Sequence, residues 1–168
     1  MDFGKDRHFA IGEHLAQYHV KKVLIYYGSD RVKRDGLLDI VEKSLKAQNI
    51  EFCECGGIIS NPLLSKVREC IEVAKSEQVD AVLAVGGGSV LDTVKAAAAG
   101  AKYDSDIWDL FSGKAKVTAA LPVFSILTLA ATGSEMNSTS VITNEDTNKK
   151  SASNRHLSFR LFPSLIQN

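Results

Sequence analysis

Three consecutive glycines separate an apolar run from a helix-forming run, and they constrain the fold of this chain more than any other feature. Residues 80–85 are typical of a short buried strand, and residues 89–101 are rich in alanine. Gly86, Gly87 and Gly88 therefore occupy a strand-to-helix turn. Without Cβ atoms the backbone can approach an anion closely, and the start of the next helix attracts negative charge. A tight turn that binds no ligand would use the same residues.

The same alternation of strand and helix runs along the rest of the chain. An α/β fold follows, with a Rossmann-like parallel sheet that carries helices on both faces. A β ribbon is expected over residues 138–143, with a polar turn at 144–149. The other predicted strands lie at 23–27, 50–55 and 121–128, and the other helices at 9–18, 37–47, 103–111 and from Asn61, as N-cap, to about Ser76.

Composition excludes several classes of partner and site. The chain has 168 residues, enough for about one domain, and its 20 basic residues balance 20 acidic ones. No overall charge attracts nucleic acid or an anionic membrane, and no signal-peptide pattern precedes residue 10, so a soluble cytoplasmic protein is expected. The three cysteines, Cys53, Cys55 and Cys70, lack the paired spacing of a zinc site, and structural burial is predicted for them.

Polar residues follow several of the predicted strands at their carboxyl ends. In an open parallel sheet ligands bind beyond these ends, so residues 28–30, 86–89 and 128–132 are expected to meet at one edge. A diphosphate would lie on the glycines, the hydroxyls of Thr128 and Thr132 near the nucleotide, and Ser29 or Asp30 near a ribose. Asp92, one turn into the helix, would equally serve as an ordinary helix-start carboxylate.

Two spaced motifs resemble a known family. Gly86-Gly87-Gly88-Ser89-x-x-Asp92-x-x-Lys95 is followed some forty residues later by residues 131–135, Ala-Thr-Gly-Ser-Glu. Together with the turn at residues 27–36, they are similar to the iron-dependent alcohol dehydrogenase superfamily, in its butanol dehydrogenase and aldehyde reductase branch. The resemblance implies a dehydroquinate synthase-like NAD(P)-binding domain, followed by a helical metal domain. It also implies hydride transfer between nicotinamide and a primary alcohol or an aldehyde, with Fe²⁺ or Zn²⁺ polarising the oxygen.

The resemblance also implies cofactor contacts in this chain. Gly87, Gly88 and Ser89 would hold the diphosphate, Asp92 would stand near the cofactor, and Lys150 or Lys149 would reach the ribose. Asp30 slightly favours NADH over NADPH, whereas the nearby Arg31, Lys33 and Arg34 could accommodate a 2′-phosphate. The full set of expected cofactor-binding residues is Gly28, Ser29, Asp30, Gly86, Gly87, Gly88, Ser89, Asp92, Thr128, Leu129, Thr132 and Lys150.

The family's metal ligands, an aspartate and three histidines, would lie beyond the end of this sequence. No catalytic or metal-binding residue is therefore expected here, and little turnover is expected from residues 1–168 alone. A non-catalytic nucleotide-binding module or pseudoenzyme, and a glycerol dehydrogenase-like enzyme, are the alternatives. Binding of NADH without metal-dependent alcohol oxidation would indicate the module. By resemblance the expected assembly is a homodimer and the substrate a small alcohol or aldehyde.

The last ten residues, 159–168, are expected to depart from the family, so the NAD(P)-binding domain is predicted over residues 1–158. Read in a shifted frame, codons for this tail can spell Ser-Pro-Ile-Ser-Ile-Phe-Asp-Pro-Glu, which resembles the family's continuation. We expect a frameshift in the gene or in its sequencing. Resequencing the DNA across codons 156–168 checks this expectation, and a downstream region with no family-like reading in any frame would contradict it.

Overall fold

The computed structural model describes residues 10–128, 138–153 and 165–166 of the chain. The central helices and strands occur where the alternating pattern predicts them. In chain order they are α1 (Ile11–Gln17), β1 (Lys22–Tyr27), α2 (Arg31–Arg34), α3 (Leu37–Ala47), β2 (Glu51–Cys55), α4 (Leu64–Ser76), β3 (Ala81–Gly86), α5 (Gly88–Gly100), α6 (Trp108–Ser112), β4 (Val123–Leu127), β5 (Val141–Asn144), β6 (Lys149–Ala152) and β7 (Leu165–Ile166).

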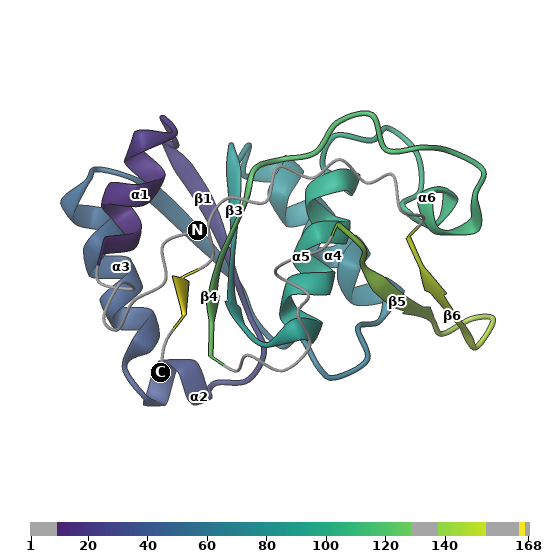
Figure 1. Cartoon of the computed structure of the whole chain (residues 1–168), viewed down its shortest axis with the longest axis horizontal. Helices are drawn as coiled ribbons and strands as arrows, with labels where there is room; N and C mark the ends of the chain where they lie inside the picture. The colour runs from purple at the N-terminus through teal and green to yellow at the C-terminus, as the bar shows by residue number, and fades with distance from the viewer. Residues whose placement is uncertain (1–9, 129–137, 154–164, 167–168) are drawn as a thin grey trace.

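Five strands form one parallel sheet in the order β2-β1-β3-β4-β7 (Figure 1). The chain first moves outward from β1 to β2, and then returns to place β3 and β4 on the other side of β1. The direction of winding therefore reverses between β1 and β3. Such a reversal separates the loops that leave the two strands and opens a crevice at their carboxyl ends.

Helices cover both faces of the sheet, as predicted. Successive side chains of a strand point to opposite faces. Leu24 and Tyr26 of β1 belong to the core beneath α4 and α5, whereas Val23 and Ile25 belong to the core beneath α1 and α3. All six residues of β3 are buried, which accounts for their almost purely apolar sequence.

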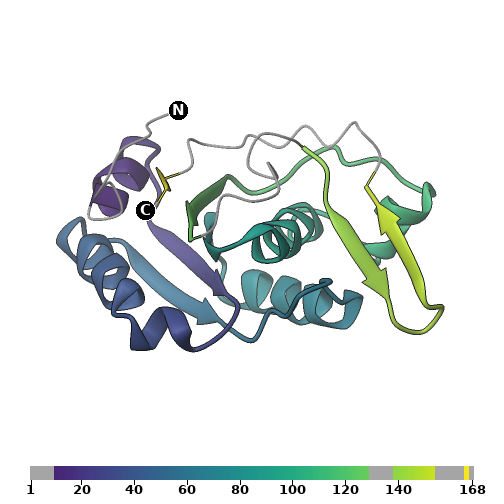
Figure 2. The same ribbon diagram turned by 60° about the horizontal axis from the view of Figure 1, so that its bottom comes forward.

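A two-stranded antiparallel hairpin, formed by β5 and β6, packs on the helical layer. Strand β5 contacts α4 and α5, and β6 contacts α6. Helices α4 and α5 lie between the sheet and this hairpin in both views (Figure 1 and Figure 2). The hairpin strands begin later than the expected ribbon at 138–143, and the turn between them lies within the predicted 144–149.

The expected start of helix α4 at Asn61 is wrong. Asn61 has a positive φ of 56°, and the helix begins at Leu64 with Leu63 in an extended conformation. The carbonyl of Pro62 accepts a hydrogen bond from the Thr143 N–H at 2.8 Å. Pairing with the hairpin thus holds this segment outside the helix, although a proline at the first turn is a typical helix-start signal. The single turn α2 was not predicted.

Several predictions lie outside the described residues. Leu129, Thr132 and the expected domain boundary after residue 158 are among them, and they stay predictions. Residues 165–166 pair with Ile126 and Leu127 as the fifth strand of the sheet. Among the described helices, none is long and apolar enough to cross a membrane.

Helices α1 and α3 cross in close contact at Gly12. The Gly12 N–H donates to the Ser44 hydroxyl at 2.9 Å, and a Cβ at Gly12 would overlap the backbone carbonyl of Ser44. We expect Gly12→Ala to lower the free energy of unfolding by about 1–3 kcal/mol, because backbone atoms must shift. Urea unfolding followed by circular dichroism measures this loss. Gly87→Ala, whose Cβ would meet no atom within 4 Å, is the matched control. An equal effect of the two substitutions would contradict the close crossing.

Candidate functional site

The junction of β3 and α5 depends on the absence of a Cβ at Gly86. This residue has a φ of 157°, and a Cβ there would lie 2.7 Å from Cγ2 of Val90. Val90 can therefore close over the end of β3, and helix α5 starts only two residues after the strand. The close approach of Val90 fixes the position of the helix start relative to the sheet.

Gly87 has a different role from Gly86. It is the N-cap of α5, with an extended backbone (φ −95°, ψ −167°), and a Cβ added there would meet no atom within 4 Å. The first helical N–H groups after it have no acceptor within the helix, since the Leu91 N–H is the one that bonds to the Gly87 carbonyl at 3.2 Å. The turn thus exposes backbone donors beside open space, which is the arrangement that binds an anion.

A cavity of about 530 Å³ lies at this junction. Its walls come from the loops after β1, β3 and β4, the three neighbouring strands on either side of the reversal in the sheet. The Thr128 N–H bonds to the Gly86 carbonyl at 3.1 Å, which joins the last two of these loops. The described residues that line the cavity are Gly28, Ser29, Arg31, Val32, Asp35, Leu37, Val85, Gly86, Gly87, Val90 and Thr128.

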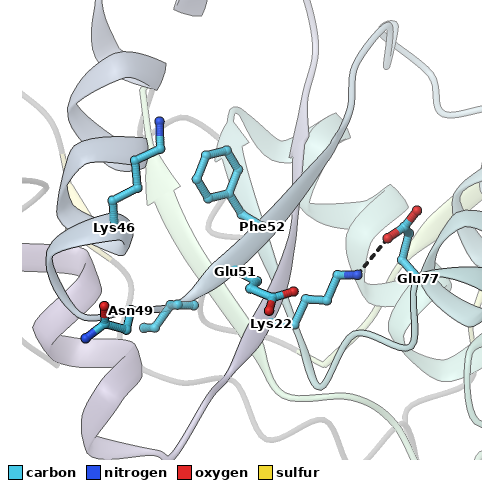
Figure 3. A pocket seen from close by; sticks show the side chains of 7 residues that line it. Lys22, Lys46, Asn49, Glu51, Phe52 and Glu77 are labelled. Carbon is cyan, nitrogen blue, oxygen red and sulfur yellow. Dashed lines mark hydrogen bonds and ion pairs between the residues drawn. The ribbon is translucent and has the colours of Figure 1, made fainter.

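A second cavity, of about 500 Å³, lies near the amino ends of β1 and β2 (Figure 3). Both of its lysines already have partners. Lys22 forms an ion pair with Glu77 at 2.7 Å, and the Lys46 ammonium lies 5.3 Å from the centre of the Phe52 ring. Because a parallel sheet binds ligands at the carboxyl ends of its strands, the cavity at the glycine turn is the better candidate site.

Carboxylates neutralise two of the cations near the candidate site. Arg31 Nε lies 3.2 Å from Asp35 Oδ2, and both residues line the cavity. Lys33 Nζ lies 2.9 Å from Glu54 Oε2 and also faces the Tyr27 ring. Hydrogen bonds to the Tyr27 hydroxyl and to Glu54 raise the pKa of Lys33. Burial opposes the ionisation of Glu54, but its hydrogen bonds to Lys33 and Tyr27 outweigh burial and lower its pKa.

Asp92 and Lys95 connect helix α5 to the hairpin. The Val141 N–H donates to Asp92 Oδ2 at 3.3 Å, and the Ser140 hydroxyl donates to the Asp92 carbonyl at 2.7 Å. Lys95 is fully buried, and its Nζ donates to the Thr139 carbonyl at 3.0 Å. These contacts hold the backbone just before β5 against α5. Asp92 therefore anchors the hairpin to α5, in addition to the cofactor contact that is expected from the sequence.

The structure brings many, but not all, of the predicted site residues together. Gly28, Ser29, Gly86, Gly87 and Thr128 line the cavity, and Gly88 and Ser89 begin the adjoining helix. Asp30 is the N-cap of α2, between two lining residues. Lys150 does not appear in the described lining. It lies on β6, where its Nζ donates to Asn61 Oδ1 at 3.2 Å.

Sequence reasoning missed the apolar wall of the cavity. Val32, Leu37, Val85 and Val90 come from four different elements, and each fits the ordinary pattern of a strand or helix. The one available signal was the position of Val85 and Val90 on either side of the glycines.

In the part of the chain that the structure describes, no group of three or more His, Cys, Asp or Glu side chains could hold a metal ion.

Comparisons with known proteins agree on one family. Residues 1–166 match the family model described as iron-containing alcohol dehydrogenase. Over 148 residues the chain is 46% identical to NADH-dependent butanol dehydrogenase A of Clostridium acetobutylicum, a match that covers 88% of this chain and 38% of that protein. Over 153 residues it is 39% identical to the NADPH-dependent aldehyde reductase YqhD of Escherichia coli, covering 89% of this chain and 38% of that protein.

Solved structures give the same result. The crystal structure of NADH-dependent butanol dehydrogenase A from Thermotoga maritima superposes with a TM-score of 0.93 at 48% identity, covering 98% of this chain and 41% of that one. This similarity confirms the predicted fold class. The chain spans less than half the length of these relatives.

The anchoring role of Asp92 predicts a local change on substitution. In Asp92→Ala the Val141 N–H loses its carboxylate acceptor, so its amide hydrogen should exchange faster with solvent and the chain should lose about 1–2 kcal/mol of stability. Hydrogen exchange read by mass spectrometry of the hairpin peptides measures the first effect. Asp39→Ala, at an exposed position in the first turn of α3, is the control and should leave the exchange at β5 unchanged. Unaltered exchange at β5 in Asp92→Ala would rule out the anchor.

Proposed function

The chain belongs to the iron-containing alcohol dehydrogenase family, and we propose that the cavity at its glycine turn binds a nicotinamide dinucleotide for an alcohol dehydrogenase or aldehyde reductase. The observation that carries this proposal is the open space beside Gly87. Its backbone lines the cavity, and no atom lies within 4 Å of where a Cβ would be. A diphosphate fits such a cradle because the anion can reach the backbone N–H groups directly.

The residues around the cavity divide into three groups. The N–H groups at the start of α5 would bind the diphosphate, with the positive end of the helix dipole behind them. Val32, Leu37 and Val85 offer an apolar wall against which an adenine ring can pack. Ser29 and Thr128 offer hydroxyl groups for ribose or phosphate oxygens. Leu129, Thr132, Asp92 and Lys150 stay predicted contacts from the sequence and are not among the described residues that line the cavity. When bound, the nicotinamide supplies a carbon that gives or accepts hydride.

We propose that this site prefers NADH to NADPH. Asp30 lies beside the lining residue Ser29, and its carboxylate would repel a 2′-phosphate. The ion pairs of Arg31 with Asp35 and of Lys33 with Glu54 reduce the positive charge that such a phosphate needs. The butanol dehydrogenases among the relatives are named for NADH, and the aldehyde reductase is named for NADPH.

The substrate and the assembly are proposals for the whole protein. The names of the relatives support a small primary alcohol or an aldehyde as the substrate. The family is iron-containing, and no group of three or more His, Cys, Asp or Glu side chains among the described residues could hold a metal ion. The homodimer and the cytoplasmic location expected from the sequence stay predictions.

Gly87→Ala tests the cofactor site. The added methyl group would occupy the space left for the diphosphate, so we expect the Kd for NADH to rise at least about tenfold, which equals roughly 1.4 kcal/mol of binding free energy. Titration of the purified chain with NADH, followed by nucleotide fluorescence, measures this Kd. NADPH should bind the unsubstituted chain about tenfold more weakly than NADH.

Lys46→Ala is the matched control, because Lys46 lines the second cavity and not the candidate site (Figure 3). Its Kd for NADH should equal that of the unsubstituted chain. Urea unfolding of Gly87→Ala should remain close to that of the unsubstituted chain, which separates lost binding from lost folding. Unchanged NADH affinity in folded Gly87→Ala would refute the site, as would loss of binding in Lys46→Ala.

A further inference from the structure

Two cysteines from different elements meet inside the chain. Cys55 is the last residue of β2 and Cys70 lies within α4, yet their sulfur atoms are only 3.2 Å apart. Both side chains are buried. A disulfide bond needs a sulfur separation of about 2.05 Å, so the two atoms have to approach by roughly 1.1 Å. Small rotations of two side chains can supply that movement.

Polar groups lie beside this thiol pair at the edge of the apolar core. Glu69, on the same helix as Cys70, places Oε1 4.0 Å from the Cys55 sulfur, and Lys66 Nζ lies 2.7 Å from the same Oε1. The Tyr26 hydroxyl donates to the Cys70 carbonyl at 3.2 Å, which fixes the backbone of Cys70. The Lys66 side chain is partly exposed, so the thiol pair lies just below the surface.

The two sulfurs are not equivalent. The hydrogen bond from the Cys70 thiol lowers the pKa of Cys55, and the positive charge of Lys66 acts in the same direction against the cost of burial. The same hydrogen bond and burial raise the pKa of Cys70. Cys55 is therefore the sulfur that ionises first. A thiolate is the reactive form of cysteine, and a second thiol in contact can trap its oxidised product.

We propose that Cys55 and Cys70 form a redox modification site, in which a hydroperoxide converts the two thiols into an intramolecular disulfide. The Cys55 thiolate attacks one oxygen of hydrogen peroxide, an S–O bond forms, the O–O bond breaks, and the departing hydroxide takes a proton and leaves as water. The Cys70 sulfur then attacks the sulfenic sulfur, and the S–O bond breaks. The released hydroxide takes the Cys70 proton, so one peroxide is reduced to two waters.

This bond would tie the sheet edge to helix α4 and close the segment between them. That segment includes Gly57 and Ile58, whose N–H groups bond to the carbonyls of Gly28 at 2.9 Å and Tyr27 at 3.3 Å. Gly28 in turn lines the cavity of the candidate site. Oxidation would thus stiffen one wall of that cavity. Because the crosslink restricts the unfolded chain, the oxidised form should melt about 5–10 °C higher than the reduced form.

Cys53 is the internal control. It lies two residues before Cys55 on β2, and its sulfur contacts the Val23 carbonyl at 4.0 Å. Burial raises the pKa of Cys53 to about 11, so it remains a thiol at neutral pH. When the folded chain is oxidised, Cys53 should therefore keep its free thiol.

The test is mild hydrogen peroxide treatment of the purified, reduced chain, in native buffer and in urea. In the folded sample the thiol count should fall from three to one, the mass should fall by two hydrogens, and peptide mapping should find only the Cys55–Cys70 bond. The urea sample should give mixed pairings that include Cys53. Cys53→Ser should behave like the unsubstituted chain, and Cys70→Ser should form no disulfide and should show no rise in melting temperature.

Three results would overturn the proposal. The first is the same mixture of pairings in the folded and urea-treated samples. The second is loss of the Cys53 thiol from the folded chain before the other two. The third is a folded chain that keeps all three thiols under peroxide that oxidises the urea-treated sample. Cys53→Ser repeats the third measurement with two thiols, and this version does not depend on the folding of Cys70→Ser.

Discussion

The contact between Val90 and Gly86 is the interaction on which the candidate site depends. It brings the start of α5 directly against the end of β3, since any side chain at Gly86 would overlap Val90. The helix dipole and the first N–H groups, which have no acceptor within the helix, are thereby aimed at the crevice between β1 and β3, where the winding of the sheet reverses. The same helix then carries Asp92 and Lys95 to the hairpin, so one packing contact positions both the turn and the segment beyond it.

The basic residues around the cavity are paired with nearby carboxylates, so they leave no large excess of positive charge there. The sequence places three cations just after β1, which suggests a site for an additional phosphate. In the folded chain Arg31 is paired with Asp35, and Lys33 turns toward Glu54 and Tyr27 at the edge of the sheet. The turn of α5 therefore remains the main source of attraction for an anion in this cavity.

The segment between β2 and α4 lies beside both the candidate site and the thiol pair. Gly57 and Ile58 in this segment donate hydrogen bonds to the carbonyls of Gly28 and Tyr27, and Cys55, just before the segment, contacts Cys70 of α4. The segment also accepts the hairpin, through the Pro62 carbonyl and the Thr143 N–H. A non-helical course for residues 61–63 satisfies these partners. A purely local preference for a helix start at Asn61 could not satisfy them.

The sequence by itself determined the alternating strands and helices, the strand-to-helix turn at Gly86–Gly88 and the resemblance to one family, because periodicity, glycine and spaced motifs are local properties of the chain. It also placed Gly28, Ser29 and Thr128 at strand ends, where the general rule for parallel sheets brings them together. Only the tertiary structure decided the order β2-β1-β3-β4-β7, the pairing of Lys33 with Glu54, the anchoring of the hairpin by Asp92 and the contact of Cys55 with Cys70. These features join residues from separate elements. Their geometry is therefore set by packing across the whole domain, which no local pattern encodes.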